Sequence, residues 1–302
     1  MGSFSGPKDW GRLLTAMLTP FASDGSVDLK GVRQVARHLV GRMGNDGIVV
    51  SGTTAESPTL SHEEKLAILD ATLEEVGDEA AVVFGAGTYN TQESIEYARA
   101  AEKAGAHGIM AVNPYYNKPG QEGLFAHFSA IAQATSLPVM LYNIQPRSSI
   151  NLETPTLVRL ATEVPNICAV KEASGNVGQI GEVCASVPTG FRVYSGDDAL
   201  TLPVMSLGGH GLVSVAAHIV GDRMKRMIEA FPTDPAQAAA IARELNPVIR
   251  AVFSAPSPVP VKYALARQGI GSPSVRLPLV ELSPEQQRHV DAVLASRAAI
   301  EV

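Results

Sequence analysis

The sequence predicts an α/β protein, a (β/α)8 (TIM) barrel with a small helical appendage at its C-terminal end. Two observations lead to this fold class. Short apolar runs alternate with amphipathic helical patterns along most of the chain, and there are eight such runs. After about residue 232 the alternation stops and only helical patterns follow. Strands that are apolar on both faces and separated by helices form parallel sheets, and eight units favour a closed barrel over an open sheet.

The apolar runs are the predicted strands. Residues 1–12 are expected to be an irregular leader. No G-x-G-x-x-G follows the first run, which argues against a dinucleotide-binding sheet. The predicted strands cover residues 13–21, 47–51, 80–85, 108–112, 138–143, 167–171, 191–195 and 211–215.

Several helices between the strands have recognisable ends. The first is predicted over residues 28–43, where apolar side chains recur on one face. Ser61 and Glu64 form a capping box at the start of the next helix. A further helix begins at Thr91 and is ended by Gly105, a residue type that terminates helices because it tolerates a left-handed conformation.

The chain is predicted to divide into a barrel domain, residues 1–232, and a C-terminal three-helix region, residues 233–302. Asp234 opens an alanine-rich helix, and a second helix is predicted over residues 258–268. The third begins at Ser283, whose sequence S-P-E-Q has a cap, a proline and a glutamine in the positions that a helix start favours. This region either covers one end of the barrel or helps to build an oligomer, and the sequence leaves both possibilities open.

Charge and composition exclude several classes of function. The 302 residues carry 24 basic and 30 acidic side chains, net charge -6, without runs of like charge. We therefore expect no nucleic-acid partner and no binding to an anionic membrane surface. No apolar run approaches the ~18 residues that a membrane span requires, and we infer neither export nor insertion. Two cysteines provide no disulfide framework and no metal-ligand spacing, so a cytoplasmic location is expected.

Lys171 is the residue on which the functional interpretation depends. It stands at the end of the apolar run I-C-A-V-K, and barrel enzymes carry their working residues at the carboxyl ends of strands. Burying an ammonium is costly unless it finds a counter-ion, reaches water or loses its proton. A deprotonated lysine can attack a ketone and form a Schiff base. The alternative is a solvent-facing lysine paired with Glu172, and this stretch alone favours that alternative.

Polar residues that suit such chemistry follow other predicted strands. Thr53 and Thr54 lie in S-G-T-T-A-E, where hydroxyl and backbone N–H groups can hold a small carboxylate; an ordinary turn with a helix cap is the equal alternative. Tyr142 ends a strand and can relay a proton if it is hydrogen-bonded to other hydroxyls. Arg147, in the loop that follows, can bind a carboxylate through two hydrogen bonds.

Other candidate groups favour less specific roles. Tyr115 and Tyr116 share a proline-braced loop, and paired loop tyrosines are more often interface residues than catalysts. Asp197 and Asp198 favour a helix cap over a divalent metal, because no third oxygen ligand or histidine pair accompanies them. The chain has no G-x-x-x-x-G-K-[ST] and no G-x-S-x-G, so phosphoryl transfer and serine hydrolysis lack support. The remaining groups suit imine chemistry on a small 2-oxo acid, without metal or cofactor.

Six motifs in order resemble the dihydrodipicolinate synthase family, within the superfamily of pyruvate-dependent lyases and aldolases. The similarity extends from about Leu13 to near the C-terminus. The motifs are G-T-T-A-E at 52–56, P-Y-Y-N-K-P at 114–119, Y-N-I-Q-P-R-S at 142–148, A-V-K-E-A-S-G at 169–175, S-G-D-D at 195–198 and G-G-H-G at 208–211.

The resemblance implies a lyase that condenses pyruvate with L-aspartate 4-semialdehyde through a Schiff base on Lys171. The product would be 4-hydroxy-tetrahydrodipicolinate, an intermediate of diaminopimelate and lysine synthesis. Tyr142 would be the acid/base group, linked to Thr53 and to Tyr116 of a neighbouring subunit. A homotetramer built as a dimer of dimers is implied. The substrate-binding residues would be Thr54 for the pyruvate carboxylate, Arg147 for the carboxylate of the aldehyde, and Gly196 and Val213 through their backbone.

The chain departs from the family pattern at a few positions. Ala55 stands where glycine is more common, and Gln145-Pro146 replaces a proline followed by a small residue in the loop that carries Arg147. Lys65 and Tyr89 differ from the pattern of lysine-sensitive members, so weak or absent inhibition by lysine is predicted. The regulatory site would map near Ser57, Pro58, His62, Lys65, Tyr89, Glu93 and Tyr115.

Two other functions would use some of the same residues. A sister lyase, such as a neuraminate lyase or a 2-keto-3-deoxy sugar acid aldolase, would share Lys171 and Tyr142 but use another aldehyde. Arg147, Tyr116 and the threonine pair favour the synthase, because a polyhydroxylated aldehyde has no carboxylate at that distance for an arginine to bind. A non-catalytic barrel that only binds a 2-oxo acid is disfavoured by the complete set of chemical groups.

Overall fold

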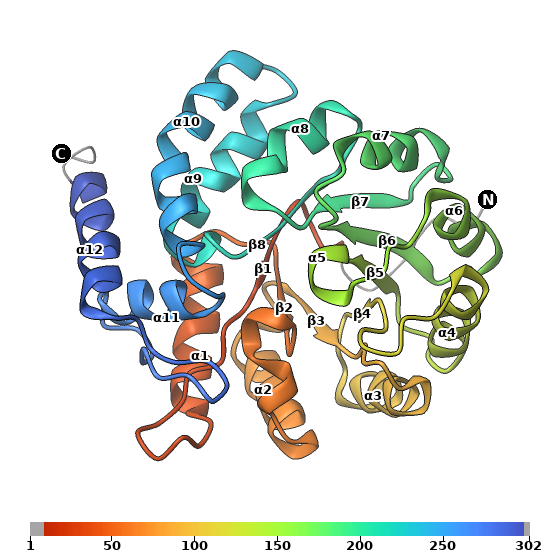
Figure 1. Cartoon of the computed structure of the whole chain (residues 1–302), viewed down its shortest axis with the longest axis horizontal. Helices are drawn as coiled ribbons and strands as arrows, with labels where there is room; N and C mark the ends of the chain where they lie inside the picture. The colour runs from red at the N-terminus through yellow and green to blue at the C-terminus, as the bar shows by residue number, and fades with distance from the viewer. Residues whose placement is uncertain (1–8, 299–302) are drawn as a thin grey trace. The chain divides into compact units, whose positions relative to one another are not determined.

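The computed structural model describes residues 9–298 (Figure 1). Residues 1–8 of the predicted leader and the last residues of the C-terminal region lie outside the described part. Eight strands close into a barrel in chain order, β1 to β8, which confirms the predicted fold class. The strands are β1 Leu13–Ala16, β2 Gly47–Val50, β3 Ala81–Gly85, β4 Gly108–Val112, β5 Val139–Asn143, β6 Ile167–Glu172, β7 Arg192–Ser195 and β8 Gly211–Ser214.

The chain forms two compact units, of which the first comprises residues 9–12 and 81–213. Its parallel strands pair in the order β3 to β8, and its helices contact one another in sequence, α3 with α4, α4 with α6, α6 with α7 and α7 with α8 (Figure 1). The helices are α3 Thr91–Ala104, α4 Gln121–Gln133, α5 Gln145–Ser148, α6 Thr154–Glu163, α7 Val177–Ser186 and α8 Thr201–Ser206.

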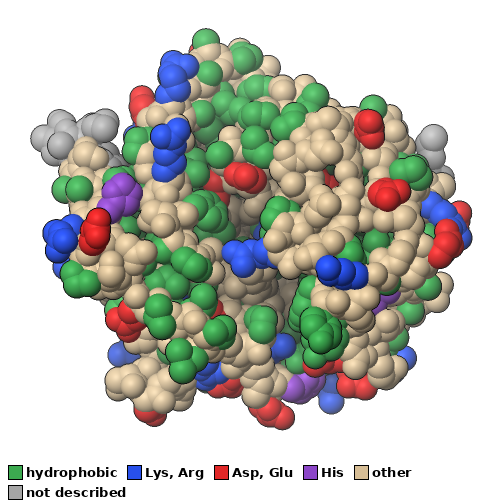
Figure 2. All heavy atoms as spheres, in the orientation of Figure 1, with side chains coloured by type: hydrophobic (Ala, Val, Ile, Leu, Met, Phe, Trp, Pro, Cys, Tyr) green, Lys and Arg blue, Asp and Glu red, His purple; other side chains and the backbone are tan. Residues whose placement is uncertain are grey.

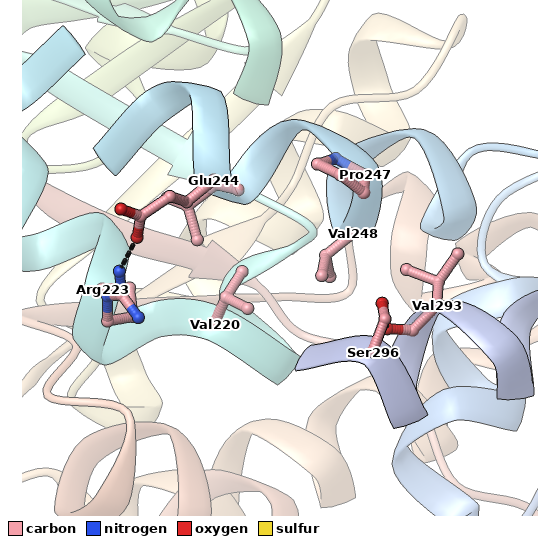
Figure 3. A pocket seen from close by; sticks show the side chains of 8 residues that line it. Val220, Arg223, Glu244, Pro247, Val248, Val293 and Ser296 are labelled. Carbon is pink, nitrogen blue, oxygen red and sulfur yellow. Dashed lines mark hydrogen bonds and ion pairs between the residues drawn. The ribbon is translucent and has the colours of Figure 1, made fainter. Parts of the chain in front are cut away.

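Within the described residues, the second unit comprises residues 13–80 and 214–298. In it α1 packs on α2, and α10 packs against α9 and α12 (Figure 1). A cavity of about 50 Å³ lies among α9, α10 and α12, lined by Val220, Val248 and Val293 (Figure 3). The three predicted C-terminal helices are confirmed. The helices of this unit are α1 Leu29–Arg37, α2 His62–Val76, α9 Ala217–Ala230, α10 Pro235–Val252, α11 Val259–Ala266 and α12 Pro284–Ala298.

The first strand is shorter than predicted. β1 pairs with β2 only as far as Ala16 with Val49, and the Met17 N–H makes one more bond to the Val49 carbonyl, 2.9 Å. Because β2 itself ends at Val50, the rest of the apolar run leaves the ladder. The run remains buried up to Phe21, which is 1% exposed. Its apolar character therefore reflects burial rather than strand structure.

The first helix also ends differently from the prediction. The α-helix stops at Arg37 and continues as a π-helical turn, His38–Arg42, in which the Met43 N–H bonds to the His38 carbonyl. In this turn His38 Nε2 lies 2.8 Å from the carbonyl oxygen of His218. The apolar pattern of a sequence does not distinguish the two kinds of helical turn, because both place similar residues on the buried face.

Two further observations concern the charge on one face and the apolar character of the helices. Acidic and basic side chains are interspersed on the face drawn in Figure 2, as expected from a sequence without runs of like charge. Among residues 9–298 no helix is long and apolar enough to cross a membrane.

Candidate active site

Lys171 and Tyr142 are neighbours on adjacent strands. They are register partners on β6 and β5, and both side chains are 4% exposed. Lys171 Nζ lies 4.2 Å from the centroid of the Tyr142 ring. The ion pairs of residues 9–298 do not include Lys171. The alternative of a solvent-facing lysine is therefore wrong, and the predicted nucleophile lies beside the predicted acid/base group.

The residues that follow this pair along each strand form a second contact. Asn143 and Glu172 are also register partners, and successive side chains of a strand point to opposite faces. The Asn143 amide donates to both carboxylate oxygens of Glu172, at 3.3 and 3.1 Å. The Ser174 N–H donates to the same carboxylate, at 2.9 Å. Glu172 thus bonds to neutral groups rather than to Lys171, and burial raises the pKa of its carboxyl.

Asn143 joins three neighbouring segments. Its Oδ1 accepts from the Asn113 side chain at 2.8 Å and from the Leu152 N–H at 3.0 Å. Because Asn113 follows β4 and Glu172 ends β6, these bonds fix the carboxyl ends of β4, β5 and β6 relative to one another. Asn143 is not among the residues predicted from the sequence. The available signal was a polar residue at the last position of a strand, immediately after Tyr142.

Gly196 lies against the predicted nucleophile. A Cβ atom at this position would come within 3.0 Å of Cε and Cγ of Lys171 and 2.7 Å of the Ala173 side chain. Its N–H donates to the Glu172 carbonyl at 2.7 Å. The close approach therefore requires glycine. Val213, the other residue predicted to line the pocket by backbone, is on β8 and is 1% exposed.

Arg147 lies on α5, a single helical turn directly after β5. Pro146 occupies the first turn of this helix, and Ser149 ends it in a left-handed conformation, φ 62°. Gln145-Pro146, where the chain departs from the family pattern, therefore begins a short helix. Arg147 is exposed and, within the described residues, takes part in no ion pair. Its guanidinium is available to bind an anion.

The two loop tyrosines occupy different environments. Tyr115 packs edge-on against Tyr89, with ring centroids 5.2 Å apart, and burial raises the pKa of its hydroxyl. Tyr116 is 89% exposed and has a φ of 72°, in the left-handed region that non-glycine residues rarely adopt. Within the described residues, Tyr116 makes no hydrogen bond or ring contact with Lys171 or Tyr142. Its exposure fits the predicted interface role.

Thr53 and Thr54 belong to the second unit. They begin a short 3-10 helix, Thr53–Ala55, directly after β2, and Thr54 is 3% exposed. The cap of the following helix α2 is Ser61, so neither threonine has that role. The segment ends at Glu56, which has a left-handed conformation, φ 57°.

Asp197 is a helix cap, as predicted. Its Oδ1 accepts from the Ala199 N–H at 2.9 Å, at the start of the short helix Asp198–Leu200. In the described part of the chain no group of three or more His, Cys, Asp or Glu residues could hold a metal ion.

Comparison with known proteins supports the resemblance found in the sequence. Residues 9–297 match the model of the Dihydrodipicolinate synthetase family. A 4-hydroxy-tetrahydrodipicolinate synthase of Moorella thermoacetica is 52% identical over 286 residues, which are 94% of this chain and 97% of that protein. The crystal structure of a dihydrodipicolinate synthase from Bacillus anthracis superimposes with a TM-score of 0.92 at 43% identity, covering 95% of this chain and 98% of the other.

A second solved structure is similar at a lower sequence identity. The enzyme from Cyanidioschyzon merolae, crystallised with lysine bound, gives a TM-score of 0.93 at 40% identity, over 96% of this chain and 98% of that one. Similarity of this extent over nearly the full length involves the barrel and the C-terminal helices alike. The chain belongs to the Dihydrodipicolinate synthetase family.

Proposed function

We propose that this protein condenses pyruvate with L-aspartate 4-semialdehyde to give 4-hydroxy-tetrahydrodipicolinate. The observation that carries the proposal is the buried Lys171, whose Nζ lies 4.2 Å from the Tyr142 ring, in a chain of this family. The relatives named for this activity favour it over the sister lyases, which would share the same two residues but act on other aldehydes.

The first half of the reaction forms an enamine. The Lys171 amine attacks the ketone carbon of pyruvate, the carbonyl oxygen leaves as water, and a protonated imine results. Loss of a proton from the adjacent methyl group converts the imine into the enamine. Tyr142 moves these protons, connected to Thr53 and to Tyr116 of a neighbouring subunit. The Asn143–Glu172 contact supports this step, because it fixes the strand ends that carry Tyr142 and Lys171.

The second half joins the two substrates. The enamine carbon attacks the aldehyde carbon, which forms the new C–C bond and regenerates the imine. The amino group of the second substrate then attacks the imine carbon, closes the ring and expels the Lys171 amine. Thr54 binds the pyruvate carboxylate, Gly196 and Val213 border it through their backbone, and Arg147 binds the carboxylate of the semialdehyde.

The assembly and location follow from the same proposal. Because a tyrosine from a neighbouring subunit is part of the proton relay, the active form is an oligomer, and a homotetramer built as a dimer of dimers is proposed. A cytoplasmic location is proposed from the biosynthetic reaction. The free cysteines Cys168 and Cys184 are consistent with a reducing compartment.

Trapping the imine tests the function. The protein is incubated with pyruvate and sodium borohydride, its intact mass is measured, and the adduct is mapped by peptide analysis. A reduced adduct at Lys171 that is absent from Lys171→Met is expected, together with faster turnover of aspartate semialdehyde than of sugar aldehydes. Preference for a sugar aldehyde would move the protein to a sister lyase, and absence of any adduct would overturn the proposal.

A further inference from the structure

A buried ion pair connects the C-terminal region to the turn that carries Thr53 and Thr54. Lys262 on α11 donates from Nζ to Oε1 of Glu56 at 2.7 Å, and the two side chains are 0% and 1% exposed. Lys262 Nζ also lies 4.1 Å from the centroid of the Phe21 ring. Burial lowers the pKa of Lys262, while Glu56 acts in the opposite direction.

Glu56 has an unfavourable backbone conformation in this turn. It ends the short helix Thr53–Ala55 and has a φ of 57°, a conformation that costs free energy for a residue other than glycine. Its second carboxylate oxygen accepts from the Arg276 N–H at 2.9 Å. The carbonyl of the preceding residue, Ala55, accepts from the Thr19 hydroxyl at 2.9 Å. The turn is thus held by groups from outside its own segment.

Arg276 connects the C-terminal region to α2, the α-helix that follows the turn. Its guanidinium donates to both carboxylate oxygens of Glu64, at 2.6 and 2.8 Å, and Glu64 belongs to the capping box of α2. It also donates to the Thr59 carbonyl at 2.7 Å. Residues 262 and 276 therefore hold the segment from Glu56 to Glu64 at both ends.

Stability alone does not account for such a pair. The desolvation of two charges offsets most of their attraction, so replacing a buried ion pair by apolar groups is often neutral or stabilising. A buried pair can, however, fix one local conformation. The local conformation here is that of Thr53–Glu56, the segment to which the proposed function assigns the pyruvate carboxylate.

We propose that Glu56 and Lys262 are positioning residues, through which the C-terminal helices hold the Thr53–Glu56 turn in the conformation that binds the carboxylate of pyruvate. This inference rests on the proposed function, because it takes the role of Thr54 from there. The C-terminal region would then position a substrate-binding turn of its own subunit, in addition to any contact between subunits.

The test uses the full-length protein and two variants. Lys262→Met removes the cation and leaves Glu56 buried without it, so its unfolding midpoint should fall by about 5–10 °C. In the double variant Glu56→Gln with Lys262→Met no buried charge remains, and most of this thermal loss should be recovered. In both variants kcat/KM for pyruvate should fall about tenfold or more and kcat by a smaller factor, because Thr54 of the displaced turn binds the carboxylate, whereas Thr53 only assists the proton transfer.

A second readout separates positioning from general damage. Borohydride trapping is compared between pyruvate and acetone, a ketone without a carboxylate, in wild type and in the double variant. A displaced carboxylate turn should lower the trapping of pyruvate more than the trapping of acetone. Equal loss for both ketones, or a double variant with wild-type kcat/KM for pyruvate, would overturn the inference.

The control is an ion pair elsewhere in the same unit, whose two side chains are 22% and 48% exposed. Arg223 on α9 pairs with Glu244 on α10 beside the cavity of Figure 3, away from the Thr53–Glu56 turn in sequence. Arg223→Met should leave kcat/KM for pyruvate unchanged. Trapping of pyruvate by the wild-type protein tests the proposed function separately. If the wild-type protein traps pyruvate but the Lys262 variants have unchanged kinetics, the positioning role is contradicted and the proposed function is not.

Discussion

Lys171 and Lys262 are both buried, but their partners differ. Lys262 is 2.7 Å from a carboxylate, which stabilises it as a structural cation. Within residues 9–298 Lys171 has no acidic partner, and its Nζ faces the Tyr142 ring at 4.2 Å. A lysine that must form and break a covalent bond has to approach its substrate, and an ion pair would hinder this. The two environments therefore match a catalytic and a positioning role.

Replacement of Tyr142 by phenylalanine separates imine formation from proton transfer. The variant keeps the ring that contacts Lys171 and removes only the hydroxyl. We expect kcat to fall by about 10²–10⁴-fold, the usual contribution of a positioned acid/base group. Borohydride should still trap pyruvate on the variant, and its unfolding midpoint should be close to that of wild type. A kcat near the wild-type value would show that another group moves the proton.

Two buried histidines predict how stability depends on pH. Burial lowers the pKa of His127 and of His218 to about 4. In the unfolded chain both titrate near 6.5, so between pH 6.5 and 4 the unfolded state binds more protons. The free energy of unfolding contributed by the two histidines is therefore complete above about pH 6.5. It falls as the pH drops, by up to about 3 kcal/mol for each histidine.

The contribution of His127 is measured by substitution. His127→Leu should show a smaller loss of thermal stability between pH 7 and pH 5 than wild type. The exposed His289 is the control, and His289→Gln should retain the wild-type dependence. Glu172 acts in the opposite direction, since its raised pKa adds stability at low pH that is lost as the pH rises. An unchanged pH dependence in His127→Leu would contradict the assignment.

The sequence indicated the candidate reactive residues more directly than the residues that support them. Lys171 and Tyr142 could be found because each ends an apolar strand, where a barrel carries its chemistry. Gly196 was predicted only from the family resemblance. The physical reason for a glycine there, the close approach to Lys171, is visible only in the structure. Lys262 and Glu56 are 206 positions apart, and nothing local in either segment indicates that they form an ion pair.

At the scale of single elements, local signals predicted helix ends well. The capping box of Ser61 and Glu64, the left-handed Gly105 and the Asp234 cap are all confirmed, because each depends on bonds within a few residues. The end of β1 and the π-helical turn after Arg37 were not predicted. Both depend on neighbours distant in sequence, the length of β2 in one case and the His218 segment in the other.

The capping box on α2 has a measurable effect on stability. The Glu64 N–H donates to the Ser61 hydroxyl at 3.1 Å, and the Ser61 N–H donates to the Glu64 carboxylate at 2.9 Å. Ser61→Ala should lower the free energy of unfolding by about 1 kcal/mol, and the midpoint by about 2–4 °C. Ser61→Thr keeps a hydroxyl and should lose less. Equal losses in both variants would show that the cap is not the cause.

For the whole molecule, the regular alternation of eight apolar runs with helices was sufficient to predict the barrel. The division of the chain at residue 232 remains a prediction. One compact unit joins distant parts of the sequence. Its contacts include α9 with β1, and the bonds of Lys262 and Arg276 to the segment from Glu56 to Glu64. A boundary drawn along the sequence cannot represent such contacts.

Regulation by lysine is predicted to be weak. The solved relative from Cyanidioschyzon merolae has lysine bound, whereas this chain carries a cation, Lys65, at a position of the predicted regulatory site. Like charges repel, so Lys65 should oppose the ammonium group of a lysine ligand. Initial rates at increasing lysine concentration should change little over the cellular range, and Lys65→Ala should become more sensitive. Strong inhibition of the wild-type protein in that range would refute the prediction.

Tyr116 connects the single chain to the proposed assembly. Its side chain is 89% exposed, an unusual state for a large aromatic residue unless another surface covers it. If it completes the proton relay of a neighbouring subunit, then Tyr116→Phe and Lys171→Met are each nearly inactive alone. A hybrid dimer of the two variants contains one site with an intact lysine and an intact tyrosine, so mixing and refolding them should restore activity. If Tyr116 acted within its own chain, every site of the hybrid would lack one of the two groups, and mixing would restore nothing.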